Sequence, residues 1–334
     1  MIRAAVFEDH GAPLVLRELP DPTPAPNGVV LKVGRCGICG SDLHMSQEHA
    51  FGATPGDVFG HEFAGVIEEV GAEVEGLKRG DTVSVVPLAS CGTCASCRAG
   101  EPAWCAQMAL QGGGYADYAA TSARQCTKLP ESASVEDGAI VEPLAVALHG
   151  VLIGAVAPGA RVLVLGAGPI GLAAAFWARR MGARAVVVQD IARHQETRAL
   201  HMGATGFVVD RDDPVAAAER ALGGKADVVF ECTGVPGLIA QAVEVLRVKG
   251  RVVVLGLCTR SDSFVPFAAV SKEVEILTSA FFKLQEYEAS LDVLNRGAVE
   301  PRVMVSDRVA LAEVPEAFEA LKTRGAQCKV MIVP

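Results

Sequence analysis

The sequence has 334 residues, of which 50% are hydrophobic and 21% charged, and its formal net charge is −9. This length exceeds what one hydrophobic core usually serves, so we expect two domains. The negative charge argues against nucleic acid or an anionic membrane as the main partner, because both favour basic surfaces. No basic and apolar leader precedes the first predicted strand, and no apolar run has the length of a membrane span. These properties predict a cytoplasmic protein.

The N-terminal region has the pattern of short strands and turns. Brief apolar runs such as Val29–Val33 alternate with proline and glycine, most densely in residues 20–26. This β-rich pattern continues to about residue 130 without a dominant helical period. A helical apolar pattern then covers Val141–Ile153, and the preceding Ser134 and Asp137 can open a helix.

From Arg161 the pattern changes to alternating strands and helices, which continue as far as Leu255. This alternation predicts a parallel sheet with crossover helices. A predicted helix at Leu284–Asn295 then precedes a short tail that ends in the strand Cys328–Val333. The tail is too short to fold alone, so we expect it to return to the N-terminal β-rich domain.

A glycine-rich turn joins the first strand of the alternating region to its first helix. Gly166 allows the tight turn, Gly168 lets the backbone approach a pyrophosphate, and Gly171 lets the helix pack closely on the strand. Pro169 and Ile170 begin the helix, whose N-terminus faces the phosphates. The turn therefore predicts a dinucleotide site, and a strand–helix turn without a ligand is the alternative.

Asp190 supports the dinucleotide site, because it ends the next strand at the spacing of about 20 residues where an acid meets the adenosine ribose. Its carboxylate would repel a 2′-phosphate, which favours NAD(H) over NADP(H). Arg193, close behind it, is also a predicted cofactor-binding residue and could weaken that repulsion. We expect NAD as the cofactor.

Four of the ten cysteines, Cys91, Cys94, Cys97 and Cys105, have the spacing C-x2-C-x2-C-x7-C. Four thiolates can enclose one Zn²⁺ tetrahedrally and leave no open position, which predicts a structural zinc site. An iron–sulfur cluster or free thiols are the alternatives, although ferredoxin-type runs have a different last spacing. The metal-ligand spacing favours reduced thiols over a disulfide framework.

A second set of candidate ligands is dispersed. Cys36-Gly-Ile-Cys39-Gly-Ser-Asp-Leu-His44 is followed by Gly60-His61-Glu62 and by Glu142-Pro-Leu. Together with the cysteine lobe and the glycine-rich turn, these motifs make the chain resemble the zinc-dependent medium-chain alcohol dehydrogenases over nearly its whole length. The resemblance implies an α/β fold with two domains. They are a GroES-like, β-rich catalytic domain at 1–150, to which 284–334 returns, and a Rossmann doubly wound parallel-sheet domain at 151–283.

The same resemblance implies a catalytic zinc held by Cys39, His61 and Glu142, with Glu62 as an exchange ligand. Which glutamate binds in the resting state stays open. Asp42 matches the carboxylate that orients the ligand histidine. Mixed sulfur, nitrogen and oxygen ligands with one open position independently suit a catalytic site. Taken singly, His61 would more often be a core histidine and Cys39 a buried thiol.

The implied reaction is hydride transfer between NAD(H) and an alcohol/carbonyl pair. Zinc assists by lowering the pKa of a bound alcohol. Ser41 and His44 match the family's proton relay to solvent, and the pKa of an imidazole suits that task. The alternatives are a helix N-cap for Ser41 and a surface histidine for His44.

The predicted substrate pocket contains Met45, Phe51 and Phe282. Sorbitol-type members, which the Glu142-Pro-Leu stretch resembles, carry polar residues where this chain has Met45 and Phe282. Their replacement predicts a more apolar pocket and a secondary or bulky, less hydroxylated alcohol as substrate. A polyol (sorbitol-like) or threonine-type dehydrogenase is the alternative.

A protein of another class would be a non-enzymatic, nicotinamide-binding structural protein. Such a protein needs the fold, but it has no need for Ser41, His44 and the zinc ligands together. The family resemblance further implies a homotetramer or a homodimer.

Overall fold

The computed structural model describes residues 1–323 and 325–334. The chain forms two compact units, the first comprising Met1–Glu142, Lys283–Ala298 and Val305–Pro334, and the second Pro143–Phe282 and Val299–Met304. These bounds differ from the sequence-based ones, because the chain passes from one unit to the other inside the helix α3 (Val135–Ile153). In addition, the short segment Val299–Met304 packs with the second unit.

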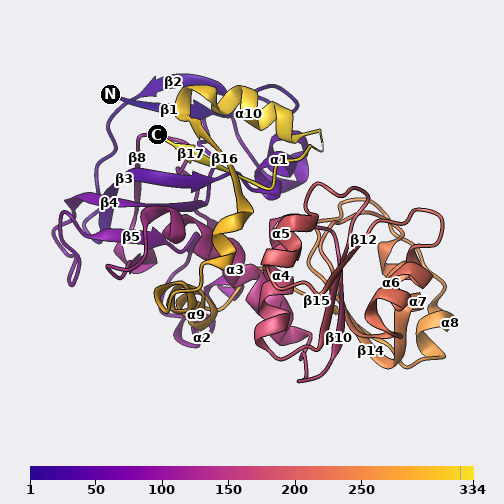
Figure 1. Ribbon diagram of the computed structural model, residues 1–334. Helices are drawn as coiled ribbons and strands as arrows, with labels where there is room; N and C mark the ends of the chain where they lie inside the picture. Colours follow the sequence, from indigo (N-terminus) through magenta and orange to yellow (C-terminus); the bar gives the residue numbers. More distant parts are fainter. Residues whose placement is uncertain (324) are drawn as a thin grey trace. The chain divides into compact units, whose positions relative to one another are not determined.

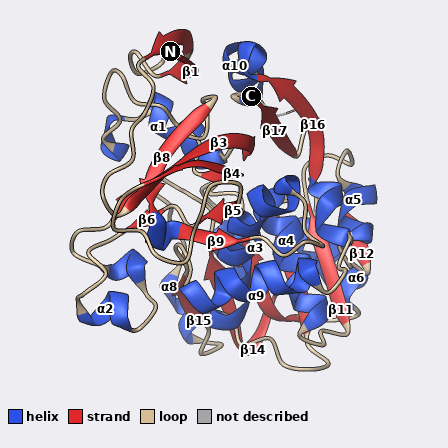
Figure 2. Cartoon of the chain, turned by 90° about the vertical axis from the view of Figure 1, so that its left-hand side faces the viewer, coloured by secondary structure: helices blue, strands red, loops and turns tan. Residues whose placement is uncertain are grey.

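The first unit is built on a mainly antiparallel seven-stranded sheet. Its strand order is β16-β17-β3-β4-β5-β9, with β8 also paired to β3. Both chain termini lie in this unit, the N-terminus at β1 and the C-terminus at β17 (Figure 2). The strands of the sheet are β3 (Gly28–Gly37), β4 (Glu62–Val70), β5 (Thr82–Val85), β8 (Tyr118–Ser122), β9 (Cys126–Lys128), β16 (Val305–Ala310) and β17 (Lys329–Val333). The separate strand pairs are β1 (Ile2–Val6) with β2 (Val15–Leu19), and β6 (Leu88–Ala89) with β7 (Ala109–Leu110).

One hydrophobic core joins distant parts of the first unit. Leu31 on β3 and Phe63 on β4 pack with Phe318 and with Ile332 on β17, and all four side chains are at most 1% exposed. The antiparallel pairing of β17 with β3 brings the C-terminal strand to this core. Burial of such side chains is the main stabilising contribution to the unit.

Short helices surround the sheet of the first unit. Over the described residues, no helix combines the length and apolar character needed to cross a bilayer. Besides the first part of α3, the helices are α1 (Gly40–Gln47), α2 (Ala95–Arg98), α9 (Leu284–Asn295), α10 (Val314–Leu321) and the 3₁₀ helices η1 (His49–Phe51), η2 (Pro102–Trp104), η3 (Ala123–Gln125) and η5 (Leu311–Glu313).

The second unit is the predicted Rossmann domain. Its six strands are parallel throughout, in the order β12-β11-β10-β13-β14-β15, with α4 and α5 on one face and α6 and α7 on the other (Figure 1). Because helices cover both faces, the central strands are continuous apolar runs such as Val162–Leu165, whose side chains are at most 2% exposed. The strands are β10 (Arg161–Leu165), β11 (Ala185–Gln189), β12 (Gly206–Val208), β13 (Ala226–Glu231), β14 (Leu246–Val254) and β15 (Glu275–Thr278). The helices are α4 (Pro169–Arg180), α5 (Glu196–His201), α6 (Pro214–Leu222), α7 (Leu238–Val245), α8 (Pro266–Val270) and η4 (Glu300–Met304).

Candidate active site

His61 and Asp42 form a buried hydrogen-bonded pair in the first unit. His61 Nδ1 lies 3.2 Å from Asp42 Oδ1, and the two side chains are 5% and 1% exposed. Asp42 belongs to the first turn of α1, where its Oδ2 accepts a 3.1 Å hydrogen bond from the backbone N–H of Cys39. Because Nδ1 is engaged with Asp42, Nε2 is the ring nitrogen left to bind a metal.

The environment of this pair fixes its charge. Burial alone would raise the pKa of Asp42, but the His61 imidazole and the hydrogen bonds from Tyr115 and Cys39 hold it below its usual value. Burial alone would lower the pKa of His61, but Asp42 and Cys39 raise it well above its usual value. A metal ion that binds His61 must therefore displace a proton.

Glu62 lies beside His61 and is held by Lys329, the first residue of β17. Lys329 Nζ is 2.7 Å from Glu62 Oε1 and 2.6 Å from Oε2, and it donates a 3.0 Å hydrogen bond to the carbonyl of Ile38. The side chains of Lys329 and Glu62 are 2% and 1% exposed. Burial alone would lower the pKa of Lys329, but Glu62 and Cys39 raise it above its usual value, so the lysine is charged.

The donor atoms of Cys39, His61 and Glu62 fit a metal ion. One atom from each residue lies within 4.8 Å of the others, and together they offer sulfur, nitrogen and oxygen. Glu62 contributes a carboxylate oxygen to this group, and Lys329 balances the charge of that carboxylate. Three protein donors around a tetrahedral zinc would leave its fourth position open, as a catalytic site requires. The arrangement suits a catalytic zinc.

Glu142 lies near this group on α3 and is 7% exposed. Burial raises the pKa of Glu142 to about 7, and the charges of His61 and Glu62 act on it with opposite sign. Among the described residues, however, the compact group of donor atoms contains Glu62 and does not extend to Glu142. The Cys39, His61 and Glu142 set therefore stays a prediction, and the geometry gives Glu62 equal standing as third ligand.

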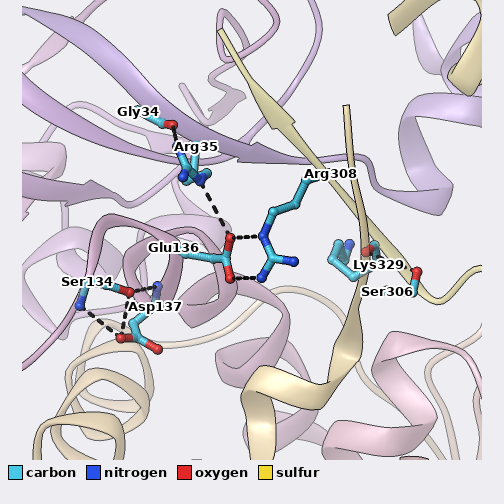
Figure 3. A network of polar contacts seen from close by, with 8 residues as sticks. All are labelled: Gly34, Arg35, Ser134, Glu136, Asp137, Ser306, Arg308 and Lys329. Carbon is cyan, nitrogen blue, oxygen red and sulfur yellow. Dashed lines mark hydrogen bonds and ion pairs between the residues drawn. The ribbon is translucent and has the colours of Figure 1, made fainter. Parts of the chain in front are cut away.

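The start of α3, which carries Glu142, is fixed by polar contacts (Figure 3). Ser134 and Asp137 exchange hydrogen bonds of 2.8 and 3.1 Å at its first turn, as their positions in the sequence predict. Glu136 accepts hydrogen bonds of 2.8 and 2.5 Å from Arg308 on β16, and Arg35 on β3 lies 3.5 Å from it. These contacts hold α3 against two strands of the sheet.

The relay candidates Ser41 and His44 both lie on α1, a helix that the sequence pattern did not predict. The N-cap of α1 is Cys39, so Ser41 is inside the helix and does not cap it. His44 is 35% exposed, and its Nδ1 lies 2.8 Å from Glu48 Oε1. This position allows His44 to exchange a proton with solvent, while the relay itself stays a prediction.

A cavity of about 340 Å³ lies beside His61 in the first unit. The predicted pocket residue Met45 lines it, together with Val58, Phe59, Leu110, Asp57 and Gln111. Phe51 belongs to η1, with its ring centroid 6.0 Å from that of His44. Phe282 belongs to the second unit and is 1% exposed, and its role in the pocket stays a prediction.

The four-cysteine lobe has the geometry of a closed zinc site. Cys97 Sγ lies 3.9 Å from Cys91 Sγ and 3.5 Å from Cys94 Sγ, and Cys105 completes the group. Four sulfurs around one Zn²⁺ stand about 3.8 Å apart. Hydrogen bonds from the backbone N–H groups of Thr93 and Cys94 lower the pKa of Cys91 to about 5, which prepares a thiolate for the metal.

The glycine-rich turn of the second unit leaves room for a dinucleotide. Gly166 has φ +100°, and a Cβ on Gly171 would lie 2.0 Å from the Gly166 carbonyl oxygen, so both positions require glycine. A Cβ on Gly168 would meet nothing within 4 Å, and this residue caps α4. Pro169 and Ile170 form the partly exposed first turn of that helix. The turn fits a pyrophosphate at the helix N-terminus.

Asp190 is fixed at the end of β11 beside this turn. Its Oδ2 accepts a 2.8 Å hydrogen bond from the N–H of Ala167, and its Oδ1 accepts one of 3.2 Å from Ala192. Arg193 is paired with Glu196 at 2.9 Å, and its side chain is 63% exposed. Glu196 therefore partly neutralises Arg193, the residue predicted to weaken the discrimination against NADP(H).

The chain matches two protein-family models. Residues 25–131 match the alcohol dehydrogenase GroES-like domain, and residues 169–296 match the zinc-binding dehydrogenase domain. A sorbitol dehydrogenase of Macaca fascicularis is 34% identical, over 97% of this chain and 94% of that protein. The chain belongs to the zinc-dependent medium-chain dehydrogenases.

Two further relatives agree with this assignment. An L-idonate 5-dehydrogenase of Vitis vinifera is 33% identical, over 93% of this chain and 89% of that protein. The crystal structure of a Sinorhizobium meliloti 1021 protein assigned to the zinc-binding dehydrogenases and bound to NADP has a TM-score of 0.92 and 31% identity, covering 100% of this chain and 99% of that one. The 334-residue chain is therefore an oxidoreductase with zinc and a nicotinamide dinucleotide as cofactors. These relatives give no support to a non-enzymatic role.

Two buried residues that contact the site, Lys329 and Tyr115, were not predicted from the sequence. Lys329 stands at the start of the apolar run Val330–Val333, and a lysine in such a strand must find a partner when it is buried. The sequence therefore contained a signal that Lys329 has a buried partner, although it did not show that the partner is Glu62. Nothing in the sequence around Tyr115 indicates that its hydroxyl reaches Asp42.

Proposed function

We propose that this oxidoreductase transfers hydride between NAD(H) and a secondary alcohol and its ketone. The observation that supports this proposal most directly is the group of Cys39, His61 and Glu62 donor atoms beside a cavity of about 340 Å³. Zinc bound there supplies a Lewis acid that polarises the substrate oxygen. Activity with NAD⁺ that is lost on chelation and restored by Zn²⁺ tests this function, whereas chelator-insensitive turnover would contradict it.

The chain's own residues divide the remaining work. Asp42 holds the His61 ring in the tautomer that leaves Nε2 for the metal. Ser41 and His44 carry the substrate proton toward solvent, and Glu48 holds the His44 ring at 2.8 Å. A His44→Gln variant should lower kcat for alcohol oxidation and leave zinc content unchanged, because the substrate proton loses its acceptor.

For the third zinc ligand we propose Glu142, with Glu62 exchanging into the site. Two isosteric variants separate the glutamates. Glu142→Gln should lose the catalytic zinc on mild chelation and most activity, whereas Glu62→Gln should keep the zinc and lose less activity. The opposite result would make Glu62 the resting ligand, a role that its position in the compact donor group supports.

NAD(H) is the proposed cofactor rather than NADP(H). The Asp190 carboxylate at the end of β11 supports this choice, as does the pairing of Arg193 with Glu196. An Asp190→Ser variant should lower the kcat/KM ratio of NAD⁺ to NADP⁺ at least tenfold. Equal use of both cofactors by the wild type would contradict the proposal, and the NADP bound to the Sinorhizobium protein makes this comparison necessary.

The substrate we propose is a less hydroxylated secondary or bulky alcohol, because Met45, Val58, Phe59 and Leu110 line the cavity with apolar groups. A polyol is the second candidate. It is supported by Asp57 and Gln111 in the same lining and by relatives named for sorbitol and L-idonate. Initial rates over apolar secondary alcohols, vicinal diols, pentitols, hexitols and threonine decide between the two. Sorbitol turnover well above that of apolar alcohols would select the polyol.

We also propose that the enzyme is a cytoplasmic homodimer or homotetramer. An exposed apolar patch on α8 and the residue before it, Val265, Phe267 and Val270, supports self-association, since these side chains are 68–75% exposed. Four cysteines stand together in the arrangement of a zinc site rather than of disulfides, which fits a reducing compartment. Sedimentation of wild type and Phe267→Glu would test the assembly, and a monomeric wild type would contradict it.

A further inference from the structure

Tyr115 is completely buried, and its side chain contacts Asp42 and the backbone residue that precedes His61. Its hydroxyl donates a 2.6 Å hydrogen bond to Asp42 Oδ2. Its ring packs against Gly60, the residue before His61, so closely that a Cβ on Gly60 would lie 2.3 Å from Tyr115 Cδ1. One side chain therefore fixes the carboxylate and the backbone that carries the imidazole.

The hydroxyl supplies one of three hydrogen-bond donors to a buried carboxylate. Asp42 is 1% exposed, and its other donors are the Cys39 N–H at 3.1 Å and His61 Nδ1 at 3.2 Å. The bond from Tyr115 is the shortest of the three. Removing a donor from a buried charge leaves the charge poorly solvated and free to turn away from its remaining partners.

We propose that Tyr115 is a positioning residue of the catalytic zinc site, whose hydroxyl fixes Asp42 so that His61 presents Nε2 to the metal. The inference deepens the proposed function and rests on the zinc site described there. A tyrosine thereby extends the usual pairing of carboxylate, histidine and zinc by one buried hydrogen bond. Partners of this kind typically change metal affinity by about 10–100-fold.

The test compares Tyr115→Phe with Tyr287→Phe. Both tyrosines are at most 1% exposed in the first unit, but the Tyr287 hydroxyl donates to the Val85 carbonyl at 3.0 Å and also contacts Ser84. Each substitution keeps the ring and removes one buried hydroxyl. Competition with a chromophoric chelator then measures the zinc affinity of the mixed-ligand site in each variant.

Tyr115→Phe should weaken zinc binding at this site about tenfold or more. It should also alter the ligand-field absorption of Co²⁺ substituted there. Tyr287→Phe should keep both within twofold of wild type, and the four-cysteine site should stay loaded in all variants. In an Asp42→Asn background, Tyr115→Phe should have no further effect, because the hydroxyl acts through the carboxylate. Wild-type zinc affinity and Co²⁺ spectrum in Tyr115→Phe would overturn the proposal.

If Tyr115→Phe fails to fold, a measurement on the wild type still tests the proposal. The chain has only three tyrosines, so ¹³Cζ labelling of tyrosine gives three assignable resonances. Removal and return of the catalytic zinc should shift the Tyr115 resonance and leave that of Tyr287 in place. An unmoved Tyr115 resonance would overturn the inference while zinc binding itself persists. A wild type that binds no zinc at this site would instead refute the proposed function.

Discussion

The two groups of metal-binding side chains in the first unit are built in opposite ways. The four cysteines lie within residues 91–105, on partly exposed turns and the short helix α2, and backbone N–H groups supply their hydrogen bonds. Cys39 caps α1, whereas His61 and Glu62 are adjacent at the start of β4. The buried side chains of Asp42 and Lys329 hold His61 and Glu62 in place. A closed site can thus be organised by local sequence, whereas an open site that binds substrate depends on the tertiary structure around it.

The largest difference between the sites should appear when one ligand is removed from each. His61→Ala deletes the catalytic zinc and should reduce kcat/KM by about three orders of magnitude, because the metal contributes several kcal/mol to the transition state. The circular dichroism spectrum should stay unchanged. Residual activity above a tenth of wild type would contradict the role of His61.

Breaking the buried ion pair between Lys329 and Glu62, which lies beside the mixed-ligand site, should strongly lower the unfolding free energy. Lys329→Met leaves the Glu62 carboxylate buried without a counter-charge, which should cost about 3–5 kcal/mol of unfolding free energy in the zinc-free protein. Zinc should reduce this loss, because the charge of a metal ion beside Glu62 partly replaces that of Lys329. Denaturant unfolding with and without Zn²⁺ measures both values, and the Lys329→Met/Glu62→Gln double variant is the matched control. If Lys329→Met lost the same unfolding free energy with and without zinc, Glu62 would not interact with the metal.

Loss of a cysteine from the closed site should lower stability rather than slow the chemical step. Cys97→Ser should release one zinc per chain and lower the unfolding free energy by about 2 kcal/mol, since structural zinc binding contributes to folding. Limited proteolysis should then cut between residues 91 and 105, while kcat at low temperature stays within threefold. If Cys97→Ser lost activity but resisted proteolysis, the four-cysteine site would be catalytic rather than structural.

The smallest expected effect concerns the contact of α3 with the sheet. Arg308 holds the pKa of Glu136 below its usual 4.5, through hydrogen bonds that outweigh burial. A lowered pKa in the folded protein contributes stability above pH 4.5, and this contribution is lost as the pH falls through the folded value. Glu136→Gln should therefore cost about 1 kcal/mol at pH 7 and progressively less as the pH falls below 4.5. If the unfolding free energy lost in Glu136→Gln did not depend on pH, the effect would come from packing rather than from charge.

Much of the second unit was predictable because its determinants are local. The predicted alternation of strands and helices after Arg161 is present, Gly166 has the positive φ of a tight turn, and Gly171 lies where a side chain would meet the backbone. The helix α1 was not predicted. Its residues Gly40–Gln47 have almost no amphipathic pattern, so hydrophobic periodicity gives no signal there.

The sequence by itself determined the alternating strands and helices, the spacing of the four cysteines and the identity of the candidate ligands. The tertiary structure alone decided which residues hold those ligands. Lys329 reaches Glu62 across 267 positions and Tyr115 reaches Asp42 across 73. Both contacts depend on sheet pairing and loop packing rather than on local pattern. A buried charge must find a partner, but the fold determines which one is within reach.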